Sequence, residues 1–540
     1  MTVPGAFQLP ERVAGLIAAA VILLRLGFVD HAPSAADAWC AAAAFLVVLG
    51  LGSTGPPPAS RVCAICFIAA AGVSLPTSIT PWTSLLALPV ALGSAGFFLL
   101  GAGNARSAAC IGLLAGGALH GATALWQRFV LWPDALARQA ELGLPPSIVQ
   151  RLQSGRTIGL SLSPDLAGGL GIAAATAGVA LLVVHRRGLR AALLLCGTTL
   201  SLAAVVLSRS SGCALALAVA GAATIAALLL RRRNRSAVVG GAGVALVVVA
   251  AGGMALTRGV PALLHSAQER LANWEVGMRL FGEHPLLGVG FARFAPAYLA
   301  ARPPDANVTR YAHSLPVTVM SEGGIVASFV IVIAAGLILR SWWHTARVGT
   351  VDRLVLLAGA LAVVARCFID YDAQIGQSAA IIGLLLGLAW TQPTDDPHPW
   401  DRRGRALLRV GVVFTVIVGL VVGWRDAAVA NPTASSPLER IDVDVALARS
   451  SATSDPRARI ELLSPLVDTA HPTPVAALLR ARARADLADL AGALEDVERA
   501  LRADPGNAGA HQMAVALAEA GLGDPVGRKA AAARWRVAIE

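Results

Sequence analysis

The sequence predicts an all-α fold, in which a polytopic membrane helix bundle of about 12–13 spans precedes a C-terminal α-helical repeat-like domain. Hydrophobic residues make up 56% of the 540 residues and charged residues only 14%, whereas a soluble domain carries about 25% charged residues. Apolar runs of the length of a membrane span recur through residues 1–424. After residue 424 the composition becomes rich in Ala, Arg, Asp and Glu, which predicts a separate domain over 425–540.

The predicted spans are apolar runs that can cross about 30 Å of hydrocarbon. We place them near residues 13–29, 38–52, 61–76, 84–101, 106–126, 165–184, 190–207, 211–230, 236–255, 325–340, 354–369, 377–391 and 407–423. The first run contains Arg25 and leads into a second span. We therefore expect it to be retained rather than cleaved as a signal peptide.

Arginine residues fall in alternate loops and so orient the bundle. If the N-terminus is cytoplasmic, the loops on its side contain Arg61, Arg106, Arg186, Arg187, Arg190, Arg231, Arg232, Arg233, Arg235, Arg340, Arg347, Arg353, Arg402, Arg403 and Arg405. The short connections on the other side, near 30–37, 77–83 and 370–376, contain no Lys or Arg. Because positively charged loops stay in the cytoplasm, the large loop 256–324, the smaller loop 127–164 and the C-terminal tail are predicted to be extracytoplasmic.

Charge and cysteine content exclude several other classes of protein. The formal net charge of +11 does not indicate nucleic-acid binding, because the arginines occupy the loops between apolar runs. Cys63 and Cys66 form a CxxC inside an apolar run with no histidine nearby, which is more typical of small buried residues than of a metal or redox site. We identify no paired carboxylates of the metal-binding DxD type and no HExxH in the outer loops, and the chain has no GxxxxGK[ST]. We expect no metal, no cofactor and no ATP-driven transport.

The tail (425–540) contains a turn that resembles a tetratricopeptide repeat. In residues 493–522, alanine-spaced helix faces flank Asp504-Pro505-Gly506-Asn507, where Pro and Gly end one helix before the next begins. A second unit near 455–490 has a weaker pattern. The tail is therefore predicted either to dock a protein partner or to act as a helical cap that stabilises the end of the chain. The second alternative stays open because so few repeats form little concave surface for a partner.

The stretch RLANWEVGMRLFGEHPLLGVGFARF (270–294) in the large outer loop is the most informative in the chain. Its run HPLLGVG (284–290), with Arg270 and Trp274 ahead of it, resembles the O-antigen ligase/polymerase family of bacterial lipid-linked glycan transferases. The stretch YAHSLPVTVMSEGGI (311–325) resembles the same family, with a histidine nine residues before a glutamate at the entrance to a span.

Weaker similarities at SGRTIGLSLSPDLAG (154–168), LSRSSG (207–212) and ARCFIDYDAQIGQSA (365–379) follow in the family's order. The chain departs from the family at Ser314 and Asp165, where asparagine is common. The resemblance implies a metal-independent, inverting glycosyltransferase in the bacterial inner membrane. It would move a glycan from undecaprenyl diphosphate to an acceptor hydroxyl on the extracytoplasmic face.

The resemblance leaves the acceptor open. A lipid A core sugar would make the protein an O-antigen ligase in lipopolysaccharide biosynthesis, a growing chain would make it a polysaccharide polymerase, and a protein would make it an O-oligosaccharyltransferase. A lipid-linked glycan transporter is the non-enzymatic alternative. A transporter is expected to place charged residues at mid-membrane depth. The candidates inside predicted spans, Arg25 and Arg366, both lie toward one end of their span, which favours the enzyme.

Arginines on the outer side are candidates for binding the donor's diphosphate, because the guanidinium group binds phosphate oxygens with a two-pronged geometry and keeps its charge. The candidates are Arg209, Arg270, Arg279 and Arg156. Arg209 lies in a tight outer turn, where positive charge is otherwise avoided, and is predicted to bind phosphate rather than to snorkel to the interface. Arg279 and Arg156 are equally compatible with a structural role.

His313 is the candidate catalytic base, because histidine exchanges protons near neutral pH and this one occupies the family's position just before a span. Glu322 is a second candidate, which either orients the loop or His313 or caps the helix that begins near Gly324. Asp370 follows Arg366 by four residues, which a helical ion pair explains. We therefore expect that pair to be structural.

Overall fold

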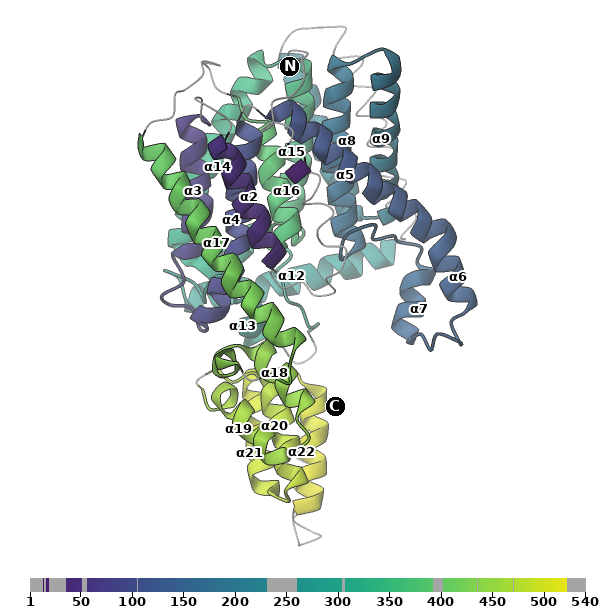
Figure 1. Ribbon diagram of the computed structural model, residues 1–540. Coiled ribbons are helices and arrows are strands. Elements are labelled where there is room, and N and C mark those ends of the chain that lie inside the picture. Colours follow the sequence, from purple (N-terminus) through teal and green to yellow (C-terminus); the bar gives the residue numbers. More distant parts are fainter. Residues whose placement is uncertain are drawn as a thin grey trace.

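The computed structural model describes residues 13, 16–18, 35–50, 56–103, 105–230, 260–303, 306–391, 402–434, 436–469 and 471–521. Over these residues the regular secondary structure is helical and contains no strand, which confirms the predicted all-α fold. Figure 1 shows a bundle of long helices with the tail extending from one of its ends.

The helices of the bundle correspond to the predicted spans that fall on described residues. They are α2 (Ala35–Gly50), α3 (Pro58–Gly72), α4 (Pro81–Ala102), α5 (Arg106–Trp126), α8 (Pro164–Val184), α9 (Gly188–Ser208), α10 (Ser211–Leu230), α14 (Leu315–Val348), α15 (Val351–Cys367), α16 (Gly376–Leu388) and α17 (Arg402–Ala430). The predicted span near 236–255, and all but a few residues of the one near 13–29, lie outside the described residues. Six of the described helices, α4, α5, α8, α9, α14 and α17, are long and apolar enough to cross a membrane.

Apolar side chains cover the outside of the bundle. Leu193 of α9, Phe329 of α14 and Val410 of α17 are each more than 60% exposed. Exposed apolar surface on this scale is unfavourable in water and is the normal outer surface of a helix bundle in lipid. The chain is therefore a multi-pass membrane protein.

Glycines let neighbouring helices approach each other closely. Between α4 and α16, a Cβ on Gly101, Gly383 or Gly387 would collide with the backbone of the facing helix. Close backbone contact through small residues is how membrane helices gain packing energy without a hydrophobic driving force. The small-residue composition of the chain thus fits the tight packing of its bundle.

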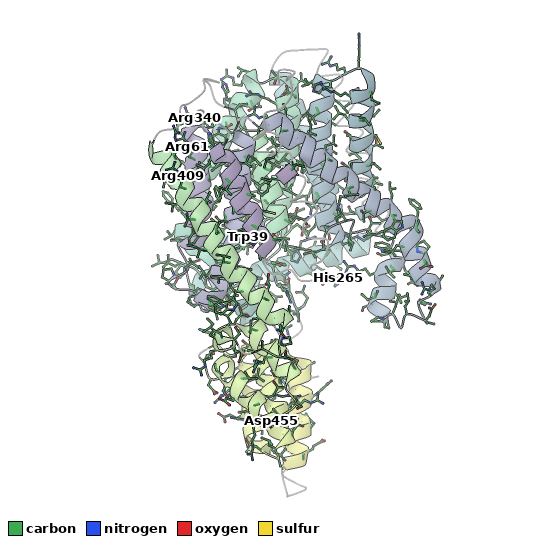
Figure 2. The ribbon with its side chains drawn as sticks, viewed as in Figure 1. Trp39, Arg61, His265, Arg340, Arg409 and Asp455 are labelled. Atoms are coloured by element: carbon green, nitrogen blue, oxygen red, sulfur yellow. The ribbon has the colours of Figure 1, made fainter. Side chains whose placement is uncertain are left out.

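The two ends of the bundle carry different segments. Arg61, Arg340 and Arg409 lie near one end, and His265 lies near the other (Figure 2). Helix α12 (Val260–Glu283), which contains His265, lies across that second end, and α13 (Phe294–Ala301) lies beside it (Figure 1). The short helices α6 (Trp132–Ala137) and α7 (Pro146–Gln153) project beside the bundle at the same end. Both long loops predicted to be extracytoplasmic are therefore at one end.

The tail begins where α17 leaves the bundle and consists of short packed helices. They are α18 (Val443–Ala452), α19 (Pro456–Val467), α20 (Pro474–Asp486), α21 (Leu490–Ala503) and α22 (Ala508–Gly521), with the short 3₁₀ turn η3 (Pro437–Arg440) ahead of them. The predicted turn at 504–507 separates α21 from α22, and Asn507 caps α22 by accepting a hydrogen bond from the N–H of Ala510 (3.0 Å).

The interior of the tail contains an arginine. Arg480 is fully buried and donates two hydrogen bonds to Asp496 (2.6 and 2.9 Å) and two to Asp468 (2.8 and 2.9 Å). A buried guanidinium is stable only when its donors are satisfied in this way. These bonds lower the pKa of Asp468 below its ordinary value.

Candidate active site

The loop 154–164, which carries one of the weaker family-like stretches, is held in place by two polar residues of the apolar helix α5 and its extension. His120 accepts a hydrogen bond at Nδ1 from the N–H of Leu160 (2.9 Å). Gln127 exchanges two hydrogen bonds with the backbone of Gly159 (2.8 and 2.9 Å). Gly159 has φ +54°, and a Cβ there would collide with the His120 ring. The sequence analysis missed both side chains, although their spacing of seven residues places them on one helix face.

Arg156 and Arg209 each donate a hydrogen bond to a backbone carbonyl next to or near the other arginine in the chain. Arg156 donates from Nε to the carbonyl of Ser208 (3.1 Å), and Arg209 donates from Nη1 to the carbonyl of Ser154 (3.1 Å). Arg156 also pairs with Asp165 (2.9 Å). Arg209 follows the last residue of α9 with φ +48°, which turns its side chain back toward the loop. The structure therefore brings together two of the predicted phosphate-binding arginines.

Arg366 is the buried centre of the site. Its guanidinium donates to both carboxylate oxygens of Asp372 (2.6 and 2.8 Å), to Asp370 (3.2 Å) and to the carbonyl of Asp165 (2.8 Å). The ion pair with Asp370 at helical i,i+4 spacing matches the expected structural pair. Gly169 of α8 leaves room for this cluster, since a Cβ there would lie 3.1 Å from Asp372 and 3.3 Å from Arg366.

Asp370 also faces the predicted base. Its Oδ1 lies 3.6 Å from Nδ1 of His313, and Asp370 is 2% exposed. Nδ1 of His313 is buried and has no hydrogen-bond partner within the described part of the chain. A carboxylate beside Nδ1 favours the tautomer with the proton on Nδ1, which leaves Nε2 free to accept a proton. The sequence analysis regarded Asp370 as structural and did not predict this contact.

Aromatic rings fix the loop around His313. The His313 ring meets Tyr371 edge to face (centroids 4.9 Å apart), and Tyr311 stacks on the Tyr371 ring at the same separation. Burial raises the pKa of Tyr371 above its ordinary value, so its hydroxyl stays protonated and donates to Ser163 (3.0 Å). His313 itself has φ +56°.

The motif HPLLGVG (284–290) docks on a break in α14. Gly324 interrupts the helix with φ +64°, and the N–H of Ile325 turns to the carbonyl of Pro285 (2.8 Å). Glu322 is buried there and accepts hydrogen bonds from the backbone N–H groups of Ala292 and Phe294 (2.9 Å each). The structure thus shows Glu322 orienting the turn after the motif, and gives it no contact with His313.

Helix α12 contributes the remaining predicted arginines. Arg270 donates to Ser266 (2.9 Å), and its Nε is buried without a hydrogen-bond partner among the described residues. Trp274, one turn further along the same face, donates to the carbonyl of His313 (3.4 Å). Arg279 follows Arg270 by nine residues, which places it on the opposite face of the helix, where it is exposed. Arg270 is therefore on the face that contacts the His313 loop, and Arg279 is not.

These contacts form one continuous network at the end of the bundle where α12 lies. Arg209 and Arg156 contact each other's loops, Arg156 pairs with Asp165, and Arg366 links Asp165 to Asp370 and so to His313. Over the residues that the structure describes, no group of three or more His, Cys, Asp and Glu side chains could hold a metal ion.

Fold and site together define a multi-pass helical membrane protein with a histidine–aspartate pair and arginines at one end of its bundle. A family model described as O-Antigen ligase matches residues 196–332, so this part of the chain is similar to the O-antigen ligase family. The match confirms the resemblance seen in the sequence and indicates a membrane glycosyltransferase of the O-antigen ligase type. It includes Arg209, Arg270, Arg279, His313 and Glu322. No curated protein matches the chain.

Proposed function

We propose that the protein transfers a glycan from undecaprenyl diphosphate to an acceptor hydroxyl at the extracytoplasmic face of the bacterial inner membrane. The observation that carries this proposal is the position of His313 against the buried Asp370, in the same contact network as Arg156 and Arg209. A base and a phosphate-binding group within one site are what displacement of a diphosphate from a sugar requires.

In this mechanism Nε2 of His313 removes the proton of the acceptor hydroxyl as its oxygen forms a bond to the anomeric carbon. The bond between that carbon and the diphosphate oxygen breaks, and undecaprenyl diphosphate leaves with the bonding electron pair. A single displacement of this kind inverts the anomeric centre. Asp370 stabilises the protonated imidazole, as a carboxylate beside Nδ1 does in other histidine-based sites.

The arginines stabilise the charge that develops on the leaving diphosphate. Arg209 and Arg270 are its main ligands in this proposal, and fixed guanidinium groups supply that charge without a metal ion. Arg270 is suited to the role because its buried Nε lacks a hydrogen-bond partner within the described residues. Arg156 already pairs with Asp165. Its contribution to binding the diphosphate comes from its positive charge beside Arg209.

The proposed sidedness of the reaction is supported by the arginines that lie at the end of the bundle opposite the site. Arg61 of α3 and Arg340 of α14 are among the arginines that the positive-inside rule assigns to the cytoplasmic side, and they lie at the end opposite His265 (Figure 2). The candidate site therefore opens on the extracytoplasmic side, where a flipped lipid-linked glycan is available.

The test is a transfer assay with the purified protein in lipid, in which donor binding and transfer are measured separately. We expect His313→Ala to lower turnover by about 10²–10⁴-fold, the usual effect of removing a general base, and to leave donor binding intact. Arg209→Ala and Arg270→Ala should weaken both, and Lys should restore only part of the loss. His265→Ala is the matched control, because His265 lies at the same end but is exposed and pairs with Glu269.

Near-normal transfer by His313→Ala would show that another group is the base. If the parent protein transfers no sugar to lipid A core, glycan or protein acceptors but moves lipid-linked glycan across the membrane, the protein is a transporter instead.

A further inference from the structure

Helix α5 ends in one turn of π-helix, η1 (Gln127–Leu131), before it continues as α6. A π turn inserts an extra residue into a helix and changes the direction of the side chains that follow it, and such turns are frequent at functional sites. Here Gln127 is directed inward to the backbone of Gly159. The next residue, Arg128, lies against Gly155 of the same loop.

Arg128 reaches the segment where Arg156 and Arg209 meet. A Cβ on Gly155 would lie 3.2 Å from the guanidinium carbon of Arg128, so this glycine, with φ +67°, makes room for that group. Gly155 directly precedes Arg156 and directly follows Ser154, whose carbonyl binds Arg209. The guanidinium groups of Arg128 and Arg209, which come from separate segments, therefore both reach the two residues that directly precede Arg156.

The charge of this cluster is not balanced by the protein. Arg156 pairs with Asp165, whereas neither Arg128 nor Arg209 forms an ion pair with any described residue. Three arginines and one aspartate give the cluster a charge of 3 − 1 = +2. A glycan-linked lipid diphosphate carries two negative charges, which match that excess.

Apolar residues continue directly from Arg128 on the surface. Phe129 is 67% exposed and Val130 is 55% exposed. A cationic group beside exposed apolar side chains is the arrangement that binds an anionic head group with a hydrocarbon chain. The ligand class that fits is a lipid whose head carries more than one phosphate charge.

We propose that Arg128 is a third ligand of the donor's diphosphate, held in place by the π turn, and that Phe129 and Val130 contact the first part of the polyprenyl chain. This inference rests on the proposed function, since it assigns a further residue to the same donor. Arg128 lies outside the residues that the O-antigen ligase model matches.

The experiment measures binding of three probes to the full-length protein in phosphatidylcholine nanodiscs. The probes are undecaprenyl diphosphate without a glycan, inorganic pyrophosphate, and phosphatidylglycerol added to the disc. Arg128→Ala should weaken binding of undecaprenyl diphosphate and pyrophosphate by about 10–100-fold, the loss expected for a charge-assisted contact. Arg128→Lys should recover part of this loss. Arg138→Ala is the matched control: it removes the same charge from the same loop, but Arg138 already pairs with Asp134 and Glu141.

An equal effect of Arg128→Ala and Arg138→Ala on diphosphate binding would overturn the proposal, as would an effect on phosphatidylglycerol alone, which would make Arg128 an anchor for ordinary lipid. Thermal unfolding of each variant shows whether it is folded, and the Lys variant supplies the comparison if the Ala variant is not. Failure of the proposed function is seen separately: the parent protein then transfers no glycan, whatever Arg128 contributes to binding.

Discussion

The tail is joined to the outer loop by a buried ion pair whose removal has a predictable cost. Arg302, just after α13, donates from Nε and Nη2 to Oδ1 of Asp504 (3.3 and 2.9 Å), in the turn between α21 and α22. The side chains are 3% and 7% exposed. We expect Asp504→Ala to release the tail from the loop, because it leaves the guanidinium buried without a counter-charge.

The size of the expected loss of stability follows from the burial of Arg302 and Asp504. Removing one partner of a buried pair costs about 3–5 kcal/mol, most of it from the charge left behind. Arg302 also donates to the carbonyl of Ala306, which does not neutralise its charge. The double replacement Arg302→Met, Asp504→Leu removes both charges and should cost less than the sum of the single changes, with a coupling energy of about 1–3 kcal/mol.

Hydrogen exchange of the full-length protein in lipid measures this cost locally. The free energy of opening should fall both in α21–α22 and in the loop 302–313, while the membrane helices keep their protection. Arg457→Ala is the control, because Arg457 is an exposed arginine of the tail. If Asp504→Ala changes the opening free energy by no more than Arg457→Ala does, the pair does not hold the tail, and the reasoning from burial is refuted.

Three further predictions concern the site, the tail and the topology. Asp370→Asn should lower turnover at least about tenfold and change the pH dependence of transfer without weakening donor binding, because it removes the charge beside Nδ1 of His313; unchanged kinetics would make Asp370 structural. Arg480 lowers the pKa of Asp468 in the folded tail. The charged Asp468 therefore stabilises the folded tail above its ordinary pKa near 3.8, and this stabilisation is lost as the pH falls through the lower pKa of the folded state. Hydrogen exchange corrected for pH should show the tail loosening below about pH 4, and Asp468→Asn should remove this dependence. Cysteine labelling should place tags after residue 540 and within 256–324 on one side of the membrane and a tag within 392–406 on the other; a tail labelled from the cytoplasm would contradict the proposed sidedness.

The elements of the bundle could be predicted from the sequence because a membrane span is determined locally, by the length and hydropathy of one segment. The site could be predicted only in part. His313 was selected by its place in a family-like stretch and Arg209 by its place in a tight turn, whereas the contacts of the His313 ring, Asp370 and Tyr371, come from the connection after α15. Asp370 and Asp372 have the spacing of a DxD pair. The sequence analysis did not identify this pair when it predicted a site without a metal. In the structure the buried Arg366 forms ion pairs with both carboxylates.

The contact between the outer loop and the tail could not be predicted either, because its two residues are far apart in the sequence. Arg302 and Asp504 are about 200 residues apart in the chain, and neither lies in a pattern that indicates burial. The π turn at 127–131 is also invisible in the sequence, because its residues continue the helical composition of α5. Long-range polar contacts depend on how the elements pack, which periodicity alone does not specify.

Backbone strain coincides with the candidate site and shows how the structure fixes it. In the described part of the chain, four residues other than glycine have positive φ, and two of them are Arg209 and His313. A conformation of this kind costs about 1–3 kcal/mol and persists only where surrounding contacts enforce it. For His313 those contacts are the hydrogen bond from Trp274 and the ring of Tyr371. For Arg209 the contact is its bond to Ser154. In the proposed function, these contacts hold both residues in place before a substrate binds, so the protein would not have to order them during transfer.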